Sequence, residues 1–341
     1  MTNYILRRLL FLPIVMLGLS LLIFCMMQLL SPYQRLTAFV SDPTKLRSGD
    51  TEALIEKYGL DDPVYQQYAR WIRNVFRGNL GYSTTVSLPV SEAIAKYFPA
   101  TLELVLFAAI PVVFGGIWMG SLSATYHNRL FDHSARVVAI VGWSLPTFVA
   151  GLLALMVFYG LLNWFPPGRI GTWAIPIVNE MHRFTGLNTI DALLNGQFRV
   201  FLDALRHLVA PVATISFVSW ALILRITRSS MLETLRQDYI TTARSKGLQE
   251  RVVIRKHARR NALIPVVTTS GLMMAGMVGG VVVVESVFGY KGIGWWATEA
   301  ARQFDFPAII GFALFNATML VFINLVVDIL YAVIDPRIRL Q

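Results

Sequence analysis

The sequence predicts an all-α integral membrane protein that crosses the bilayer six times. Of its 341 residues, 55% are hydrophobic and only 15% are charged, whereas roughly 25% are charged in an average soluble domain. The apolar residues gather in six stretches that are almost free of charge and long enough to cross about 30 Å of hydrocarbon. The basic residues gather between these stretches in a pattern that places both termini in the cytoplasm.

Each of the six apolar stretches predicts one transmembrane helix. They cover residues 9–30, 100–124, 137–163, 208–224, 263–284 and 308–333. No small-residue cleavage site follows the first stretch, so we expect a retained helix rather than a signal peptide. Only Glu103 and Asp328 are charged within the six, and each lies near the end of its span, where a carboxylate is expected to reach headgroups or water.

The orientation follows from the basic residues of the connecting segments. With the amino terminus inside, the inner segments carry 16 Lys and Arg against 5 acidic residues, and the outer segments carry 14 against 13. An excess of Lys and Arg marks the cytoplasmic side of a membrane protein. The net charge of +10 therefore reports topology, and it does not indicate a partner nucleic acid.

These spans divide the chain into an amino-terminal part with the first helix (1–30), an extended outer segment (31–99) and a core with the other five helices (100–341). Within the outer segment, Asp62 and Pro63 predict the start of a helix, because a carboxylate caps free N–H groups and proline fits the first turn. The residues that follow predict an amphipathic helix. It either lies on the membrane or the helix bundle, or covers an external opening at which a partner docks.

A glycine-rich segment, residues 285–307, connects the fifth and sixth spans. Its glycines permit a tight re-entrant turn, and Trp295 and Trp296 are expected at headgroup depth. The alternative is an ordinary interfacial loop.

The longest inner segment, residues 225–262, predicts two short helices that form a projecting elbow. Asp238 is expected to cap a helix that begins at Tyr239 and ends at Gly247, a residue suited to the left-handed position after a helix. A second, basic helical stretch covers residues 250–258. The alternative is a charged loop that sets the topology and contacts anionic lipid.

The sequence lacks the common catalytic motifs. It contains no G-x-x-x-x-G-K-[ST] phosphate loop and no H-E-x-x-H, so we expect no catalytic, metal-binding or cofactor-binding residue in this chain. An ion-coupled secondary transporter would more naturally place a carboxylate at mid-membrane, and the spans have none. In the fifth span, a row of small residues predicts either close helix packing or a path-lining face. The row consists of Gly271, Ala275 and Gly279, with Gly276 and Gly280 beside it.

The elbow carries a resemblance to a known family. Residues 238–248 and 257–265 resemble the coupling-helix segment of binding-protein-dependent ABC importer permeases, specifically the first permease subunit of dipeptide and oligopeptide systems. In the family's pattern of Glu-Ala-Ala, three residues and Gly, only Ala243 and Gly247 match outright. The resemblance continues through residues 4–10, 58–63, 78–83, 98–104, 144–148 and 335–340. It departs at residues 30–32, where Leu-Ser-Pro replaces the Leu-Pro-Gly-Asp-Pro of many members.

The resemblance implies a permease subunit that forms half of a translocation pathway for a peptide or similar small solute. A second, similar permease subunit would complete the pathway, two cytoplasmic ATPase subunits would bind ATP and Mg²⁺, and an external solute-binding protein would deliver the solute. The chain would bind no cofactor of its own, and it would contact membrane lipid but no nucleic acid. It would reside in the cytoplasmic membrane of a bacterium or archaeon, as a multi-pass protein.

The resemblance also implies roles for individual residues. The coupling helix would present Asp238, Tyr239, Thr242, Ala243, Arg244, Lys246 and Gly247 to an ATPase. In that helix, Ala243 would allow close approach of the partner and Gly247 would end the helix. Pro146, Met273, Met274 and Gly276 are expected to border the pathway. The substrate stays open, because similar permeases serve peptides, glutathione, nickel and oligosaccharides.

Overall fold

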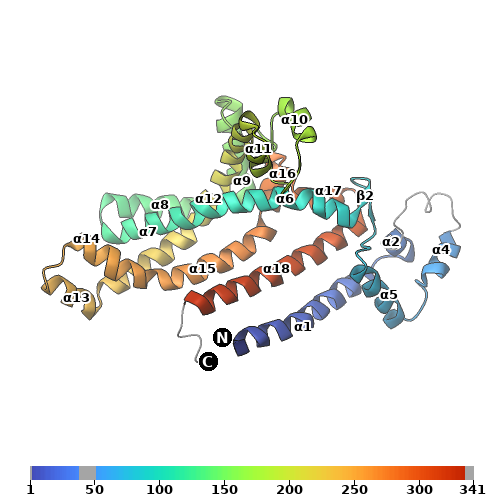
Figure 1. Ribbon diagram of the computed structural model, residues 1–341, viewed down its shortest axis with the longest axis horizontal. Coiled ribbons are helices and arrows are strands. Elements are labelled where there is room, and N and C mark those ends of the chain that lie inside the picture. The colour runs from blue at the N-terminus through green and yellow to red at the C-terminus, as the bar shows by residue number, and fades with distance from the viewer. Residues whose placement is uncertain (1, 38–50, 335–341) are drawn as a thin grey trace. The chain divides into compact units, whose positions relative to one another are not determined.

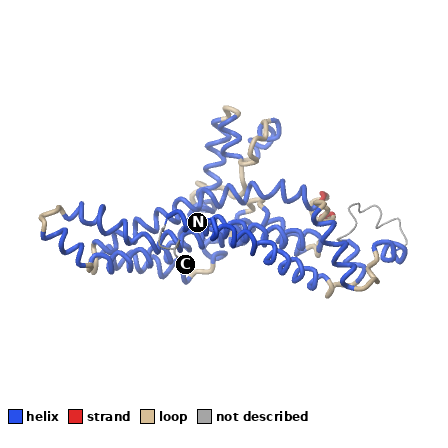
Figure 2. The backbone as a smooth tube through the Cα atoms, turned by 60° about the horizontal axis from the view of Figure 1, so that its bottom comes forward, coloured by secondary structure: helices blue, strands red, loops and turns tan. Residues whose placement is uncertain are grey.

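A computed structural model describes residues 2–37 and 51–334, and this part of the chain is almost entirely helical (Figures 1 and 2). Its one sheet is a short hairpin in which β1 (Tyr82–Ser83) pairs antiparallel with β2 (Leu88–Pro89). The chain forms two compact units, Met1–Thr101 with Lys291–Ile329, and Leu102–Tyr290 with Leu330–Gln341. The prediction of an all-α fold is therefore confirmed. Residues 335–340, one of the segments that carry the family resemblance, lie outside the described residues.

The first unit is built around the amino-terminal helix. Its helices are α1 (Thr2–Met27), α2 (Pro32–Thr37), α4 (Thr51–Tyr58), α5 (Val64–Phe76), the start of α6 (Val90–Ile110), α17 (Ile293–Arg302) and most of α18 (Phe306–Ile334). One apolar cluster joins Phe24 and Met27 of α1 to Trp71 of α5 and to Ile310 of α18. The outer amphipathic helix therefore packs on the helices of its own unit.

Helix α5 begins one residue later than the sequence predicts, and the capping role expected of Asp62 is wrong, because no side chain caps this helix. Pro63 occupies the position before the first helical residue, Val64. Gln67 of this helix is buried, and its amide Nε2 donates to the carbonyl oxygens of Leu60 at 2.8 Å and Asp62 at 2.7 Å. A buried amide is tolerated because these bonds replace those it loses to water.

A second cluster in the first unit contains the later part of the glycine-rich segment. Trp296 is fully buried with Ile293, Val90 and Ala308, and its indole Nε1 donates to the hydroxyl of Ser83 at 3.3 Å. Trp296 is therefore enclosed by protein, and its depth in the membrane stays a prediction. Its ring is large enough to anchor α17 in the unit's core.

The second unit is organised around one long helix, α12 (Phe198–Leu235). The other elements, in chain order, are the end of α6, the π-helix η1 (Pro111–Gly115), α7 (Gly116–Thr125), α8 (Leu130–Ser144), α9 (Thr147–Ala154), the π-helix η2 (Leu155–Leu161), η3 (Thr172–Ala174), α10 (Ile175–Glu180), α11 (Asn188–Leu194), α13 (Asp238–Ser245), α14 (Glu250–Val252), the π-helix η4 (Val253–Ala258), α15 (Arg259–Gly280) and α16 (Val282–Phe288). Helices α7, α8, α9, α11 and α15 all contact α12 (Figure 1).

Among the described residues, three helices are long and apolar enough to cross a membrane. They are Val90–Thr125, Phe198–Leu235 and Phe306–Val327, and the first and second are longer than the spans predicted there. The predicted third span, residues 137–163, is wrong as a single straight helix, because α8 and α9 meet at an angle of 106°. Pro146 lies at this break, lacks a backbone N–H and disfavours a helical residue before it.

Glycines bring α7 close to α12. A Cβ on Gly116 would lie 2.7 Å from the Cβ of Ile223, and one on Gly120 would lie 2.6 Å from the Cβ of Thr227. These two glycines are four residues apart, the spacing at which small residues let helix backbones approach closely. The sequence predicted such packing in α15 instead, where the side chains of three of the five small residues lie outside those described.

Candidate functional site

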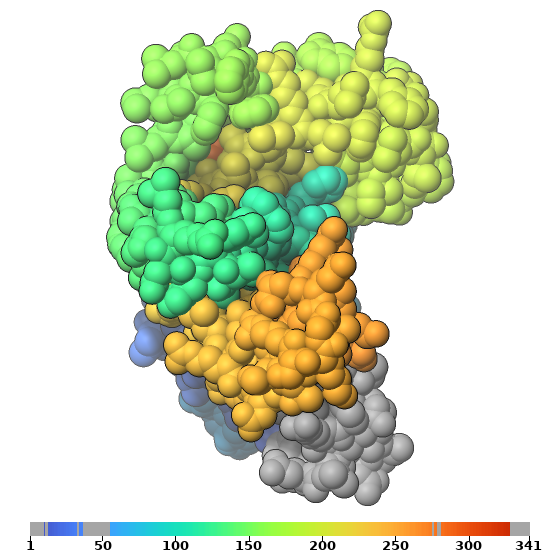
Figure 3. Space-filling view, turned by 90° about the vertical axis from the view of Figure 1, so that its left-hand side faces the viewer, coloured from blue at the N-terminus to red at the C-terminus, as the bar shows by residue number. Residues whose placement is uncertain are grey.

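The elbow is predicted within residues 225–262; α12 continues to Leu235, and the remaining part, residues 236–262, forms one end of the second unit. Figure 3 faces this end and shows its amber atoms beside the teal-green atoms of α7 and α8. A cluster of buried residues, mostly small, holds the elbow together. Its members are Ala124 of α7, Met231 of α12, Ile240 and Ala243 of α13, Val253 and Ala258 of η4, and Ala262 of α15. Small side chains at these contacts let the short segments pack closely.

The start of α13 differs from the sequence prediction, whereas its end agrees with it. Asp238 lies in the first turn of the helix, not before it, and the residue before it, Gln237, makes no side-chain cap bond. The expected capping role of Asp238 is therefore wrong, although its charge still favours the positive end of the helix dipole. The prediction for Gly247 is confirmed: it has φ of +73° and follows Lys246, the residue that caps the end of the helix. The backbone N–H of Gly247 donates to the carbonyl oxygen of Arg244 at 2.9 Å, and that of Leu248 donates to the carbonyl oxygen of Ala243 at 3.4 Å. These two bonds are the pattern of a Schellman motif.

The seven predicted coupling residues separate into two groups. Asp238, Tyr239, Thr242, Arg244, Lys246 and Gly247 are all exposed. Ala243, by contrast, is only 6% exposed and packs inward with Ile240 against the chain itself. The role expected of Ala243, close approach to a partner, is therefore revised: its small side chain lets α13 lie close to the rest of the elbow.

Two polar contacts tie α13 to the segments that follow it. The amide Nδ2 of Asn261 donates to the phenol oxygen of Tyr239 at 3.0 Å. Arg244 forms a two-point ion pair with Glu250, with Nη2 to Oε1 at 2.7 Å and Nε to Oε2 at 3.1 Å. The hydrogen bonds from Arg244 lower the pKa of the Glu250 carboxyl below its ordinary value. Because both side chains are about half exposed, water screens most of this attraction.

A cavity of about 700 Å³ lies between α12 and the segments η1, α9 and η2. It is lined by Pro111, Leu145, Ala150, Leu153, Ala154, Val157, Phe158, Val209, Val212, Ala213, Thr214, Ser216, Phe217 and Trp220. The hydroxyls of Thr214 and Ser216 donate to carbonyls of their own helix, so the wall offers mostly apolar surface. The indole Nε1 of Trp220 donates to the Pro111 carbonyl oxygen at 2.7 Å. This bond fixes the π-helix η1 against α12.

The four predicted pathway residues do not line this cavity. Pro146 lies just before α9 and directly after Leu145, which does line the cavity. Met273, on α15, packs with Ile117 and Val266 in a separate apolar cluster. On the same helix, Met274 is half-buried and Gly276 is exposed, and a Cβ added to Gly276 would meet no other group within 4 Å.

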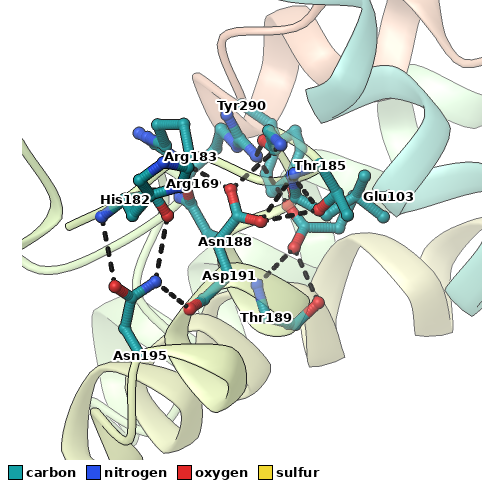
Figure 4. Close-up of polar contacts among 12 residues, drawn as sticks. Glu103, Arg169, His182, Arg183, Thr185, Asn188, Thr189, Asp191, Asn195 and Tyr290 are labelled. Carbon is teal, nitrogen blue, oxygen red and sulfur yellow. Dashed lines mark hydrogen bonds and ion pairs between the residues drawn. The ribbon is translucent and has the colours of Figure 1, made fainter.

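The second unit also carries a polar anchor that the sequence did not reveal. Glu103 of α6 is 1% exposed and holds three residues through four hydrogen bonds (Figure 4). Its Oε2 accepts from Arg169 Nη2 at 2.7 Å and from the hydroxyl of Tyr290 at 2.9 Å. Its Oε1 accepts from both the backbone N–H and the hydroxyl of Thr189, at 2.7 and 2.8 Å. The expectation that Glu103 reaches headgroups or water is therefore wrong.

This anchor holds a segment that we name the cap, residues 164–197. A second buried carboxylate, Asp191, folds the cap on itself by accepting from the backbone N–H of Thr185 at 2.8 Å and of Gly186 at 2.9 Å (Figure 4). Burial, together with the neighbouring Glu103 carboxylate, raises the pKa of the Tyr290 phenol well above its ordinary value. Tyr290 thus stays a neutral hydrogen-bond donor.

Asp328, the other charged residue within a predicted span, belongs to α18, but its side chain is outside the described ones. Within the described residues, no group of three His, Cys, Asp or Glu side chains is placed to hold a metal ion.

Comparison with known proteins identifies relatives along the whole chain. The family described as binding-protein-dependent transport system inner membrane component matches residues 116–340. The amino-terminal family of such membrane components matches residues 1–105.

Individual relatives are similar over most or all of their length. The "Probable D,D-dipeptide transport system permease protein DdpB" of Escherichia coli K12 is 42% identical and matches 87% of this chain and 88% of its own. The di/tripeptide transport system permease protein DppB of Pseudomonas aeruginosa is 39% identical over 100% of both chains. The oligopeptide transport system permease protein AppB of Bacillus subtilis is 38% identical over 99% of this chain and 100% of its own.

A search of solved structures adds an amino acid ABC transporter crystallised with histidines. It has a TM-score of 0.49 and 16% identity, and the match covers 71% of this chain and 94% of that one.

Proposed function

This chain belongs to the binding-protein-dependent transport system inner membrane components, the permease subunits of ABC importers, and from that premise we propose how it works. It forms half of a pathway for a peptide or a similar small solute, and the elbow couples this pathway to ATP hydrolysis by a partner. The ATPase chemistry belongs to other subunits, because a permease of this family is not itself an ATPase.

The observation that carries the proposal is the continuity of α12. This helix has 38 residues without a break, which corresponds to about 57 Å at 1.5 Å per residue. Its middle, from Val209 to Trp220, lines the 700 Å³ cavity, and Met231 near its end packs into the elbow cluster. A displacement of the elbow would therefore move a wall of the cavity as one rigid element, the kind of transmission that rigid-body switching requires.

The exposed side of α13 is the proposed contact with the ATPase. Asp238, Tyr239, Thr242, Arg244, Lys246 and Gly247 would meet the partner, while Ala243 and Ile240 fasten the helix to the permease. A short helix held by a small apolar cluster and two polar contacts transmits force, because it does not slide on its own support.

The assembly proposed around this chain follows from the family. A second permease subunit would complete the pathway, two ATPases with ATP and Mg²⁺ would lie at the elbow side, and an external solute-binding protein would bring the solute. The chain would cross the cytoplasmic membrane of a bacterium or archaeon six times with both termini inside, in contact with lipid and with no nucleic acid. The bent pair α8 and α9 would count as one of the six spans.

The substrate class comes from the relatives, which are named as dipeptide, di/tripeptide and oligopeptide permeases. The path would run beside the large cavity, and Pro146, Met273, Met274 and Gly276 would border it. An ion-coupled carrier is not favoured by these relatives. Glu103 would also be a poor proton carrier, because Arg169, Thr189 and Tyr290 already hold both of its oxygens.

Uptake by the complete complex in lipid vesicles tests this function. Vesicles that contain both permeases and both ATPases, with the binding protein outside, should accumulate labelled di- and oligopeptides only when ATP is inside. Ionophores that collapse proton and sodium gradients should leave the uptake rate unchanged. Uptake that needs an ion gradient and no ATP would overturn the proposal, and uptake of glutathione or an oligosaccharide in place of peptides would overturn the substrate class.

A further inference from the structure

A second cleft, of about 270 Å³, lies between α8 and α12 on the elbow side of the large cavity. It is lined by Arg136, Ala139, Ile140, Trp143, Ser144, Ala221, Leu222, Leu224, Arg225, Arg228 and Ser229. Three of these residues are arginines, and all of the others except the two serines are apolar. The function proposed above gives this cleft no role.

One of the three arginines is neutralised inside the protein. Asp132 is fully buried at the start of α8, where its Oδ1 accepts from Arg228 Nε at 2.7 Å and its Oδ2 accepts from Arg228 Nη2 at 2.8 Å. The hydroxyl of Ser123 and the backbone N–H of Asn128 complete the coordination of this carboxylate. Its acceptor positions are therefore occupied, and it ties α8 to α12.

The other two arginines leave positive charge without an equal partner. The Nε of Arg136 lies 3.6 Å from Oδ1 of Asp132, which is farther than the Arg228 atoms that already bind this carboxylate. The Nη2 of Arg136 lies 2.8 Å from Nδ1 of His133. Arg225 is exposed, and no ion pair or hydrogen bond of its side chain is found among the described residues. The cleft wall thus has three guanidinium groups, with one carboxylate beside it, which leaves a surplus of about two positive charges.

An apolar surface continues from these charges along α8. Val137, Ile140, Val141 and Trp143 are each between 47% and 65% exposed, and Ile140 and Trp143 also belong to the cleft wall. A ligand that satisfies both parts must carry negative charge at one end and hydrocarbon at the other. A free anion would leave the apolar wall uncovered, whereas an apolar protein surface would bury two guanidinium groups that lack a full counter-charge, at a cost.

We propose that this cleft binds one anionic phospholipid of the cytoplasmic leaflet. Its phosphate would lie between Arg136 and Arg225, and an acyl chain would follow Ile140 and Trp143. Basic pockets between transmembrane helices on the cytoplasmic side suit anionic headgroups, and arginine binds phosphate through two parallel N–H groups. The assignment to this leaflet rests on the proposed orientation. Because the cleft adjoins the Asp132–Arg228 pair, the bound lipid would brace the junction of α8 and α12 beside the elbow.

A photoreactive phosphatidylglycerol tests the site in the complete importer. The complex is placed in nanodiscs of phosphatidylcholine with a small fraction of the probe, irradiated, digested and mapped by mass spectrometry. We expect labelling of the α8 peptide that contains Ile140 and Trp143, and competition by unlabelled phosphatidylglycerol. The double variant Arg136→Gln, Arg225→Gln should weaken this competition roughly ten- to thirty-fold, the size expected for two basic residues at the membrane surface. Arg199→Gln, at the other end of α12 and also exposed, should leave it unchanged.

Further experiments distinguish lipid binding from binding of other ligands and from misfolding of the variant. Arg225→Gln alone removes a side chain for which the described residues offer no ion pair, and it should still weaken binding several-fold. Equal competition by glycerol phosphate or inorganic phosphate would identify an anion site and overturn the lipid assignment. Absence of labelling in the assembled importer, as expected if a partner subunit covers the cleft, would overturn it too. Because the readout is labelling, a failure of peptide uptake would not alter it.

Discussion

In the second unit, the elbow and the cap each contain a short helix that ends in the same way, but different interactions attach the two segments to the rest of the unit. In each, a short helix ends at a glycine in the left-handed region, Gly247 with φ of +73° and Gly196 with φ of +69°, and a Cβ at either position would meet no other group within 4 Å. The backbone hydrogen bonds after the two helices also correspond. In the cap, the N–H groups of Gly196 and Gln197 donate to the carbonyl oxygens of Leu193 and Ala192, as those of Gly247 and Leu248 do to Arg244 and Ala243 in the elbow. The two helix ends therefore have the same backbone geometry, and the two segments differ in the interactions that hold each of them in place.

The cap is fastened by buried charge, and the elbow by small apolar side chains. Glu103 and Asp191 are buried, and both oxygens of each accept hydrogen bonds, an arrangement that tolerates little displacement because an unpaired buried charge is expensive. The elbow instead relies on alanines and on the exposed pair Arg244–Glu250. This contrast suits a fixed cap and an elbow whose outer side remains available to a partner.

The largest effect should follow from breaking the buried anchor of the cap. Glu103→Gln keeps the shape of the side chain but leaves Arg169, whose side chain is only 16% exposed, without a counter-charge. Removing one partner of a buried pair costs about 3 to 5 kcal/mol. We expect a clearly lower thermal unfolding temperature of the purified complex, measured by intrinsic fluorescence, and loss of peptide uptake.

The matched control for that variant is Glu180→Gln, which removes the same charge from an exposed position in the cap and should leave the unfolding temperature unchanged. Equal unfolding temperatures for Glu103→Gln and the native complex would show that the cap does not depend on buried charge.

A smaller effect should come from overfilling the elbow cluster. Ala243→Leu adds three carbons to a site that is 6% exposed, and overpacking a filled core costs about 1 to 3 kcal/mol. The loss of stability should already be present in the permease pair without the ATPases, measured by its thermal unfolding. Thr242→Leu, at the exposed neighbouring position, should leave that stability unchanged. If Ala243→Leu affected only the assembly with the ATPases, Ala243 would face the partner and the inward role would be wrong.

The two glycines give a direct exchange test of the comparison. Gly247→Asp forces a side chain into the left-handed region, at about 1 kcal/mol, and brings negative charge to the negative end of the helix dipole. Gly196→Asp introduces the same strain and charge at the cap. Both complexes should fold. Only Gly247→Asp should uncouple ATP hydrolysis from uptake, so that the number of peptides transported per ATP hydrolysed falls about tenfold. Equal coupling in the two variants would remove the coupling assignment from the elbow.

The sequence predicts the elbow far better than the cap, and the reason is distance along the chain. The end of α13 is decided by Gly247 and the residues beside it, so local chemistry suffices. Glu103 is held by Arg169, Thr189 and Tyr290, which lie 66, 86 and 187 residues away, and no local pattern brings them together. The charge of Glu103 inside a predicted span was the available signal, but its burial could only come from the fold.

Helix packing shows the same division between local and distant information. Pro146 marks a weak point of the third span in the sequence, yet whether a proline kinks a helix or separates two depends on its neighbours, and here the helices turn by 106°. Gly116 and Gly120 stand in a recognisable small-xxx-small spacing, as do residues of α15. Only the position of α12 decides that the first pair is in close contact.

The smallest effect concerns the exposed ion pair of the elbow, and it depends on pH. Arg244 lowers the pKa of Glu250 below the ordinary 4.5, so the pair contributes its full stabilisation above pH 4.5 and loses it as the pH falls through the lowered pKa. Since both groups are about half exposed, the contribution is below about 0.5 kcal/mol. Hydrogen exchange of the α13 amides should therefore quicken by less than about threefold in Glu250→Gln at neutral pH, and that difference from the native protein should shrink at acid pH. Glu233→Gln, an exposed carboxylate at the end of α12, should not change the exchange. An effect of about tenfold in Glu250→Gln would mean that charge fastens the elbow as it does the cap, and the contrast between the two segments would be lost.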